Sequence, residues 1–468
     1  MRNVRTGPKR PVRILSVFGP AAAAFALAAA GPITPAAAAA PQVQLTAAAA
    51  SGQGLKDFYK ARDGQLLWLS KPGRQAHLLV ELLASADLDG VAPGRYRVAE
   101  LRNALQAASS GNRRAMRRAD AALSQAFVDY VRDLRTPADS DVLYVDSELK
   151  PKAPKARSIL EAAAKAPSLE AYIAEMGWMH PMYAQLRHAL ASGAYDTQQK
   201  SIIRVNMDRA RELPGGDERY ILVNAAAQRL FMYEHGRPID SMRVVVGKPK
   251  YPTPMMAALI RFAALNPYWY VPTDLAAERI APMVVKRGKE YLDRQGYQVV
   301  SSFAGDPQIY DPMTIDWQAV ADGKQQILVR QLPGPYNSMG RIKFMFPNSA
   351  GVYLHDNPER ELFEQAARLY SGGCVRLEDA WRLSHWLFHK DLTWEGAGTE
   401  EKVPLKTPVP VYITYLTAVP DGSTVASSTT FISAMAPVWP PRTVRRSPRL
   451  TDAASPGHSD QVATYCRR

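Results

Sequence analysis

The sequence predicts an α+β protein with a mainly helical first half and a β-rich second half. Through residues 54–215 apolar residues recur at the spacing of amphipathic helices. From about residue 218 they fall instead in short alternating runs rich in β-branched and aromatic residues. The 468 residues leave room for two or three domains, and a hydrophobic content of 47% is enough to build sizeable cores.

The first forty residues have the composition of a secretory signal peptide. Residues 1–13 carry five basic side chains and no acidic one, and an apolar run over 14–31 and a stretch of small residues follow. Two Gly-Pro pairs interrupt the apolar run, which makes it a poor membrane-spanning helix. We therefore expect residues 1–40 to be a cleaved signal peptide, residues 41–53 to form an Ala-rich linker, and the protein to be exported to the periplasm.

The helical pattern of residues 54–215 predicts a helical scaffold region. Leucines recur three and four residues apart from Leu78 to Leu83, and residues 119–134 place apolar side chains on one stripe. Residues 155–212 continue the same spacing.

The β-rich half, residues 216–420, is predicted to be a separate domain, and it contains the candidate catalytic residues described below. Residues 219–248 alternate in short runs with a hairpin at Gly236, and comparable runs recur further on. Residues 274–325 are charged and helical in pattern, as expected of an insertion over a sheet. Residues 421–468 are rich in Ser, Thr, Pro and Arg and show no periodic pattern of apolar residues, so we expect a disordered basic tail there.

The net charge of +14 is concentrated at the two ends of the chain. The body between them keeps only a mild positive balance, which does not require nucleic acid as a partner. It is compatible with an anionic envelope polymer or a membrane surface.

The stretch "LYSGGCVRLED" carries the best candidate for a catalytic residue, Cys374, which is one of two cysteines in the chain. Gly372 and Gly373 allow a sharp turn before it, and Arg376 and the start of a following helix favour a thiolate. Three interpretations stay open at this point: a nucleophile, an inert buried thiol, or a disulfide with Cys466 in the tail.

A cysteine nucleophile needs a base, and "VYLHDNP" supplies His355, 19 residues before Cys374 and at the end of an apolar strand. The group that orients its ring could be Asp356, another side chain or a backbone carbonyl. His385 and His389 have the i, i+4 spacing of some zinc sites, but "HWLFH" lacks the glutamate of that motif. We therefore predict no metal and no other cofactor.

These blocks resemble the L,D-transpeptidases with a YkuD-type catalytic domain. The match rests on "VYLHDNP" and "SGGCVR", on "RQLPGPYNSMGRIKFMFPN" just upstream, and on "NPYWYVP" and "VVVGKPKYPTP" in the expected order. It spans about residues 218–418, and the helical first half resembles the scaffold of the large periplasmic subfamily. The resemblance implies a YkuD-like β-sandwich with a helical, lid-like insertion over 274–325.

The resemblance also implies acyl transfer on peptidoglycan, without a cofactor. Cys374 would attack the diaminopimelate carbonyl of a tetrapeptide stem and release the terminal D-alanine, with His355 as general base and acid. The side-chain amine of a second diaminopimelate would then take the acyl group and form a 3→3 cross-link. The partners would be these two stem peptides, and envelope synthesis proteins are further candidates.

The resemblance gives the neighbouring residues supporting roles. The amides of Gly373 and Cys374 would form the oxyanion hole, and Arg376 would position the loop or a substrate carboxylate. Four further residues would line or flank the substrate groove, with a packing role equally open for each: Tyr353, Trp269, Asn337 and Gly340.

The chain departs from the family pattern at Gly372, where His or Ser is common, and in the tail. Within the same fold, an L,D-carboxypeptidase, an enzyme that cleaves a 3→3 bond and a lipoprotein-attaching enzyme remain alternatives. A non-catalytic wall-binding scaffold is the alternative from another class, although such a module would not need both Cys374 and His355.

Overall fold

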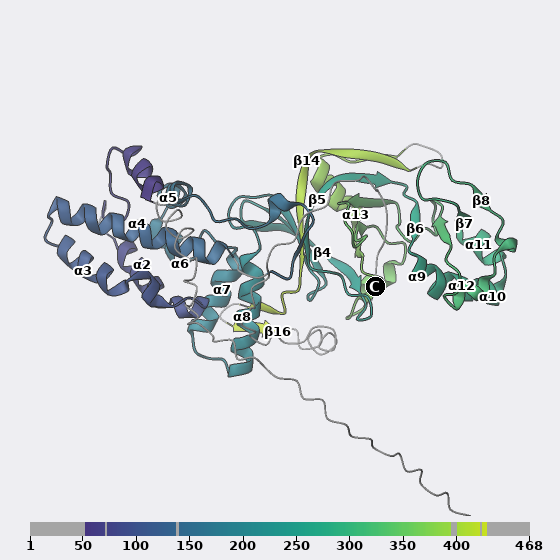
Figure 1. Cartoon of the computed structure of the whole chain (residues 1–468), viewed down its shortest axis with the longest axis horizontal. Helices are drawn as coiled ribbons and strands as arrows, with labels where there is room; N and C mark the ends of the chain where they lie inside the picture. Colours follow the sequence, from purple (N-terminus) through teal and green to yellow (C-terminus); the bar gives the residue numbers. More distant parts are fainter. Residues whose placement is uncertain (1–51, 71–72, 137–139, 395–399, 422–423, 428–468) are drawn as a thin grey trace, which may run out of the picture. The chain divides into compact units, whose positions relative to one another are not determined.

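The first half of the described chain is built from amphipathic helices (Figure 1). The computed structural model describes residues 52–70, 73–136, 140–394, 400–421 and 424–427, so the predicted signal peptide, most of the linker and most of the tail lie outside it. Within these ranges no helix combines the length and the apolarity needed to cross a membrane. After a helical segment at 52–60, the helices of the region are α2 (Gln75–Ala84), α3 (Val98–Ala108), α4 (Arg113–Arg135), α5 (Ala156–Lys165), α6 (Leu169–Ala174), α7 (Pro181–Ala191) and α8 (Thr197–Arg211).

These helices enclose an apolar core of their own. Helix α4 contributes Phe127, Tyr130 and Leu134, all fully buried on the stripe that the sequence predicted. The Phe127 ring makes edge-on contacts with Trp68 and Trp178, at centroid distances of 5.3 and 5.0 Å. Burial of such rings is worth a few kcal/mol each. The prediction of a helical N-terminal region is confirmed.

The second half is dominated by a sheet that closes on itself. Its strand order is β1-β5-β10-β11-β13-β4-β3-β2-β14, and β14 also pairs with β5. The apolar core lies inside this closed sheet, which confirms the predicted β-rich second half. The strands on this path are β1 (Leu143–Tyr144), β2 (Tyr220–Asn224), β3 (Arg229–Glu234), β4 (Arg237–Gly247), β5 (Met256–Leu265), β10 (Ile342–Met345), β11 (Leu354–His355), β13 (Val375–Leu377) and β14 (Glu401–Thr414).

Two short elements complete the domain around the candidate site. Strand β12 (Leu369–Ser371) pairs with β4 just before Cys374, and helix α13 (Ala380–Phe388) follows β13. Asp379 caps this helix by accepting the N–H of Arg382 at 2.9 Å.

The helical region and the sheet share one strand. Strand β1 lies in the connection between α4 and α5, yet it pairs in parallel with β5, with Leu143 opposite Met256. Asp146, just after β1, accepts the N–H of Leu259 at 2.7 Å and pairs with Arg261. The scaffold region therefore contributes to the edge of the catalytic sheet.

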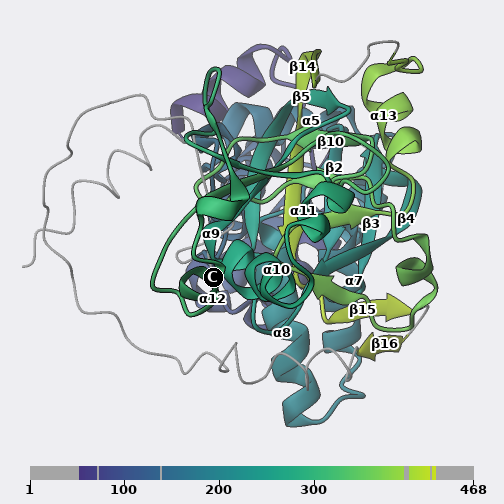
Figure 2. The same cartoon turned by 90° about the vertical axis from the view of Figure 1, so that its right-hand side faces the viewer.

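The insertion is a mixed α/β subdomain, which corrects the prediction of a helical one. Strands β7 (Tyr297–Val300) and β8 (Ile309–Tyr310) join β6 (Trp269–Val271) and β9 (Leu328–Gln331) in a sheet of order β6-β9-β7-β8. Val299 and Val300 explain the strand, because β-branched residues favour extended backbone. Helix α10 (Ala281–Arg287) contacts α12 (Trp317–Ala321) on this subdomain, which faces the viewer in Figure 2. The subdomain has its own apolar core, and its other elements are α9 (Thr273–Leu275), the π-helical η4 (Ala276–Ile280), α11 (Glu290–Gln295) and η5 (Pro312–Thr314).

The structure also corrects the start of the predicted disordered tail. Strand β16 (Thr424–Ser427) pairs with β15 (Ala418–Asp421), and Val425 packs against the core of the helical region. Residues 428–468 lie outside the described part of the chain.

Candidate active site

The candidate catalytic residues share one face of the closed sheet. Leu354 in β11 and Val375 in β13 are register partners, and both are fully buried in the apolar core. Because side chains alternate along a strand, the next register pair, His355 and Arg376, points to the opposite face, as does Cys374 just before β13. The parallel pairing of β11 and β13 therefore brings Cys374 and His355 to adjacent strands on the same face.

The imidazole of His355 is buried and held by backbone carbonyls. Its exposed fraction is 1%, and Nδ1 donates to the carbonyl of Asp356 at 2.6 Å, with the carbonyl of Met339 as a second partner. Burial, together with the nearby cations Arg376 and Lys343, lowers the pKa of His355 to about 3. The ring is therefore neutral at physiological pH, and the hydrogen on Nδ1 leaves Nε2 as its basic nitrogen.

The question of what orients His355 is thus answered by a backbone carbonyl, not by the Asp356 carboxylate. That carboxylate accepts the N–H of Arg341 at 2.9 Å and pairs with Arg360 at 2.8 Å. Gly340 makes this arrangement possible, because a Cβ at its position would lie 2.4 Å from Asp356 Oδ2 and its φ is +64°. Gly340 therefore has a packing role.

The turn that carries Cys374 is fixed by two hydroxyl groups. Ser371 Oγ donates to the carbonyl of Cys374 at 2.6 Å and accepts the N–H of Gly373 at 3.1 Å. Thr253 Oγ1 donates to the carbonyl of Gly373 at 2.8 Å. The Cys374 thiol is 8% exposed and donates to the carbonyl of Gly351 at a sulfur–oxygen distance of 3.7 Å.

This turn corrects the role predicted for Gly373. Its amide already donates to Ser371, so in this arrangement it is not available to an oxyanion. Its φ of +118° shows instead that glycine is needed to form the turn. The proposed disulfide partner, Cys466, lies outside the described residues.

Arg376 anchors the chain that follows His355. Its guanidinium pairs with Glu359 at 2.6 Å and donates to Asn357 Oδ1 at 3.3 Å. These contacts match the loop-positioning role that was one of its two predicted roles.

The side chain of Asn337 stabilises the loop before β10 through hydrogen bonds to backbone groups. Its amide donates to the carbonyls of Pro267 and Leu332 at 3.0 and 2.9 Å, and its oxygen accepts the N–H of Met339 at 2.7 Å. With an exposed fraction of 1%, Asn337 is a structural residue. Its effect on the site is indirect, because it holds the Met339 backbone against His355.

The two aromatic residues of the predicted groove have different surroundings. Tyr353 is half-buried in the strand segment leading to His355, and its carbonyl accepts the N–H of Val375 at 2.9 Å. Trp269 packs in the core of the insertion, with its ring 6.4 Å from that of Tyr297. Packing therefore accounts for Trp269, while Tyr353 lies beside the candidate catalytic residues.

The insertion contacts the turn that carries Cys374, at Gly372. A Cβ at Gly372 would lie 3.3 Å from Leu275 Cδ1, and Leu275 is in α9, the first helix of the insertion. Nearby, Glu278 accepts from Lys250 at 2.7 Å and from the hydroxyl of Tyr251 at 2.6 Å. Glycine at this position thus leaves room for the insertion.

Three polar residues that sequence reasoning had not assigned to the site belong to it. Ser371 and Thr253 shape the cysteine turn, and Lys343 lies on β10 directly opposite His355. All three fall inside the sequence blocks that carried the resemblance. In "RIKFMF" the lysine alternates with residues of the core, a pattern that places it on the other face of the sheet.

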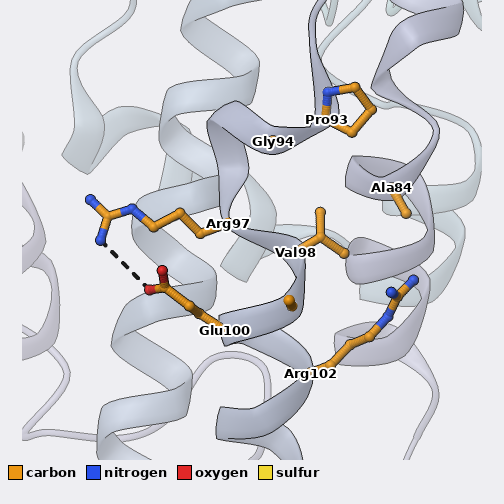
Figure 3. Close-up of a pocket in the computed structure, with 8 residues that line it drawn as sticks. Ala84, Pro93, Gly94, Arg97, Val98, Glu100 and Arg102 are labelled. Carbon is orange, nitrogen blue, oxygen red and sulfur yellow. Dashed lines mark ion pairs between the residues drawn. The ribbon is translucent and has the colours of Figure 1, made fainter.

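A hollow on the helical region lies outside this site. Figure 3 shows it beside α3, with Val98 and Arg102 on that helix and an ion pair between Arg97 and Glu100 at 3.6 Å. Both members of that pair are largely exposed, so the pair adds little stability. None of the predicted site residues lines this hollow.

The sheet, the cysteine turn and the fixed imidazole together define a candidate cysteine–histidine acyl-transfer site on a closed β-sheet. Comparisons with known proteins give the family. Residues 218–412 match the L,D-transpeptidase catalytic domain, YkuD, and residues 53–190 match the Scaffold domain. The chain therefore carries a YkuD L,D-transpeptidase catalytic domain preceded by a Scaffold domain.

Parts of the chain are also similar to individual proteins. A curated Haemophilus influenzae protein named "Putative L,D-transpeptidase" is 28% identical over 315 residues, which are 64% of this chain and 63% of that protein. Among solved structures, an L,D-transpeptidase from Mycobacterium smegmatis is 14% identical, with 43% of this chain and 63% of that chain covered and a TM-score of 0.20. L,D-transpeptidase 1 from Mycobacterium tuberculosis is 15% identical at the same coverages, with a TM-score of 0.18.

Proposed function

We propose that the protein is a peptidoglycan L,D-transpeptidase that forms 3→3 cross-links through a thioester at Cys374. The observation that carries this proposal is the register of β11 and β13, which brings Cys374 and a neutral, backbone-oriented His355 to one face of the sheet. The catalytic-domain match over residues 218–412 supports the choice of reaction.

In the first half-reaction the thiol of Cys374 attacks the diaminopimelate carbonyl of the donor tetrapeptide. His355 takes the thiol proton, a C–S bond forms, and the amide C–N bond to the terminal D-alanine breaks. His355 returns the proton to the departing amine. D-alanine therefore leaves with a neutral amino group, and the donor stem remains bound to Cys374 as a thioester.

In the second half-reaction the side-chain amine of a diaminopimelate on another stem attacks the thioester. The C–N bond of the cross-link forms, the C–S bond breaks, and His355 accepts the amine proton and returns it to the Cys374 sulfur. This step needs an unprotonated imidazole, and the low pKa of His355 supports that requirement.

The test is to incubate the purified protein with disaccharide-tetrapeptide and identify the products by mass spectrometry. A dimer lighter by one alanine is the expected product. Release of D-alanine with tripeptide alone would indicate an L,D-carboxypeptidase instead, because water would then be the acceptor.

The matched controls use the two cysteines of the chain. Cys374→Ala should abolish both the dimer and the tripeptide, whereas Cys466→Ser should leave the products unchanged. Activity that survives Cys374→Ala would overturn the mechanism, and absence of any product from the wild-type protein would favour a non-catalytic wall-binding role.

We also propose that the protein acts outside the cytoplasm, since the composition of residues 1–40 is that of a signal peptide and peptidoglycan lies in the cell envelope. Fractionation should recover it with the envelope or periplasm, with an N-terminus near residue 41. Recovery of the full-length chain from the cytoplasm would contradict this.

A further inference from the structure

A buried lysine occupies the sheet position next to the candidate base. Lys343 in β10 is the register partner of His355, and Ala264 of β5 is its partner on the other side. Its strand neighbours Ile342 and Phe344 are fully buried in the apolar core, so Lys343 points to the opposite face, the face that carries His355. Register thus places Lys343, His355 and Arg376 in one row across three strands.

The ammonium group of Lys343 is held in place by contacts from two other segments. Its side chain is 7% exposed, and Nζ pairs with Glu400 at 2.9 Å and donates to the carbonyl of Tyr268 at 3.2 Å. Glu400, whose side chain is 12% exposed, also accepts the N–H of Tyr268 at 3.1 Å. The ring of Tyr270 lies 5.6 Å from Nζ.

A buried ion pair of this kind is weak support for stability. Removing two charges from water costs several kcal/mol per ion, and apolar residues of similar volume often replace such a pair without loss. The position of Lys343 in an otherwise apolar strand of alternating pattern therefore calls for another explanation. Its neighbours on the same face supply one.

The charge of Lys343 acts on both candidate catalytic groups. Burial lowers the pKa of Lys343, whereas the charges of Glu400 and Cys374 act to raise it, so thiolate and ammonium favour each other. Lys343 in turn adds to the effect of burial in lowering the pKa of His355. Of the other charged groups nearby, Arg376 pairs with Glu359 and Asp356 pairs with Arg360. Lys402 on β14 lies in the same register row, two strands from Lys343 on the far side of Ala264, and acts to lower the pKa of Lys343.

We propose that Lys343, fixed by Glu400, is a positioning residue that sets the charge environment of the Cys374–His355 pair. The ammonium favours the thiolate form of Cys374 and disfavours the imidazolium form of His355. Glu400 moderates this effect and fixes the position of the charge. The inference rests on the proposed function in taking Cys374 and His355 as the reacting groups.

The test measures the reactivity of Cys374 without any peptidoglycan. The full chain carrying Cys466→Ser, so that Cys374 is its sole cysteine, is alkylated with iodoacetamide across a range of pH. This reagent is neutral, so its approach does not depend on the charge of the site. The apparent midpoint of the rate profile reports thiolate formation, whereas the plateau at high pH reports access to the sulfur.

The two single variants have opposite expected signs. Lys343→Met removes a positive charge, so the midpoint should rise by about one pH unit, which makes alkylation at pH 7 roughly tenfold slower. Glu400→Gln removes a negative charge, so the midpoint should fall. The double variant Lys343→Met/Glu400→Gln should return close to the parent midpoint.

Opposite shifts distinguish electrostatic positioning from structural damage, which would change the plateau or move both midpoints the same way. Should Lys343→Met fail to fold, Glu400→Gln and the double variant still give signed tests. Midpoints that are unchanged, or that move together, would overturn the inference. The result is independent of the substrate, so a failure to cross-link tetrapeptides would count against the proposed function and not against the role of Lys343.

Discussion

At the scale of single residues, the two glycines before Cys374 have different physical roles. Gly373 has a φ of +118°, which L-residues rarely adopt, whereas Gly372 is not in that region and its absent Cβ leaves room for the flexible Leu275 side chain. Gly372 is therefore a point of close packing against the insertion. The backbone requirement lies at Gly373.

Alanine at the two positions separates these roles. Gly373→Ala should lower the free energy of unfolding by about 1–3 kcal/mol and slow alkylation of Cys374, because the turn must distort. Gly372→Ala is the matched control and should stay within about 1 kcal/mol of the wild type, since Leu275 can shift by a few tenths of an ångström. Thermal and denaturant unfolding measure both, and equal effects would contradict the assignment of roles.

Asn337 provides a second prediction at this scale. Its buried amide binds backbone on both sides of the loop and places Met339 against His355. Asn337→Ala should cost about 1–3 kcal/mol of stability by leaving buried groups unpaired, and it should also reduce the rate of acyl transfer by folded protein.

Asn224 is the matched control for that variant. It is equally buried, and its amide group bonds the backbone of Leu416 in both directions, at 3.0 Å each, in contacts that do not involve the His355 loop. Asn224→Ala should lose comparable stability but keep the rate per folded molecule. If both variants lose only stability, Asn337 does not act on the site through Met339.

At the scale of elements, helix α7 begins with a histidine that must stay unprotonated. His180 is its N-cap, and Nδ1 accepts the N–H of Met182 at 3.2 Å, which a protonated nitrogen could not do. Burial, together with the nearby cation Arg135, lowers the pKa of His180 to about 3. The unfolded chain therefore binds a proton at His180 between about pH 6.5 and pH 3 that the folded chain does not.

This difference makes the stability of the protein depend on pH. The contribution of His180 is fully present above about pH 6.5 and is lost as the pH falls toward 3, with a slope of up to about 1.4 kcal/mol per pH unit. His180→Asn keeps a capping side chain without the titration, so its urea-unfolding free energy should fall less steeply between pH 6.5 and pH 4. An unchanged slope would contradict this assignment.

The elements also show how far the sequence could predict this structure. The helices were predictable because a 3.6-residue period persists over stretches such as α4, whose periodic apolar residues form the buried stripe of the helix. Cys374 and His355 were predictable as a pair from residue type and motif. Lys343 could have been found from the alternation in "RIKFMF", since a charge between buried Ile342 and Phe344 must face the other side of the sheet.

Other features required the three-dimensional structure. The amide of Gly373 donates a hydrogen bond to Ser371 Oγ. The hydrophobic periodicity of a sequence does not show which nearby group will accept a hydrogen bond from the backbone of a turn. Asn337 and Gly340 were placed near the groove, but long-range contacts to Pro267 and Asp356 decide that they pack. The strands of the insertion were hidden because four residues are too few to establish a period.

At the scale of the whole molecule, the helical region and the catalytic domain are connected by strands at two places in the sequence, before the first strand of the catalytic domain and after β14. Strand β1 comes from the helical region and pairs with β5, while β15 and β16 return from the end of β14 to pack against α7 and α8. Ala418 in β15 belongs to the core of the helical region. We infer that the two regions stabilise each other.

The contact between Asn206 and Thr417 tests this mutual support. Asn206 in α8 is fully buried, and it donates to Thr417 Oγ1 at 3.0 Å and accepts the N–H of Thr417 at 2.7 Å. Asn206→Ala leaves that N–H without its acceptor, at a cost of about 1–3 kcal/mol. Because the lost bonds connect the two regions, hydrogen exchange should accelerate together in α8 and in residues 415–418.

Asn112→Ala is the control for this prediction. Asn112 caps α4 through local bonds to the N–H groups of Arg114 and Ala115, so its loss should cost about 1 kcal/mol and leave exchange in residues 415–418 unchanged. Faster exchange confined to α8 in Asn206→Ala would show that the helical region and the end of the catalytic domain open independently.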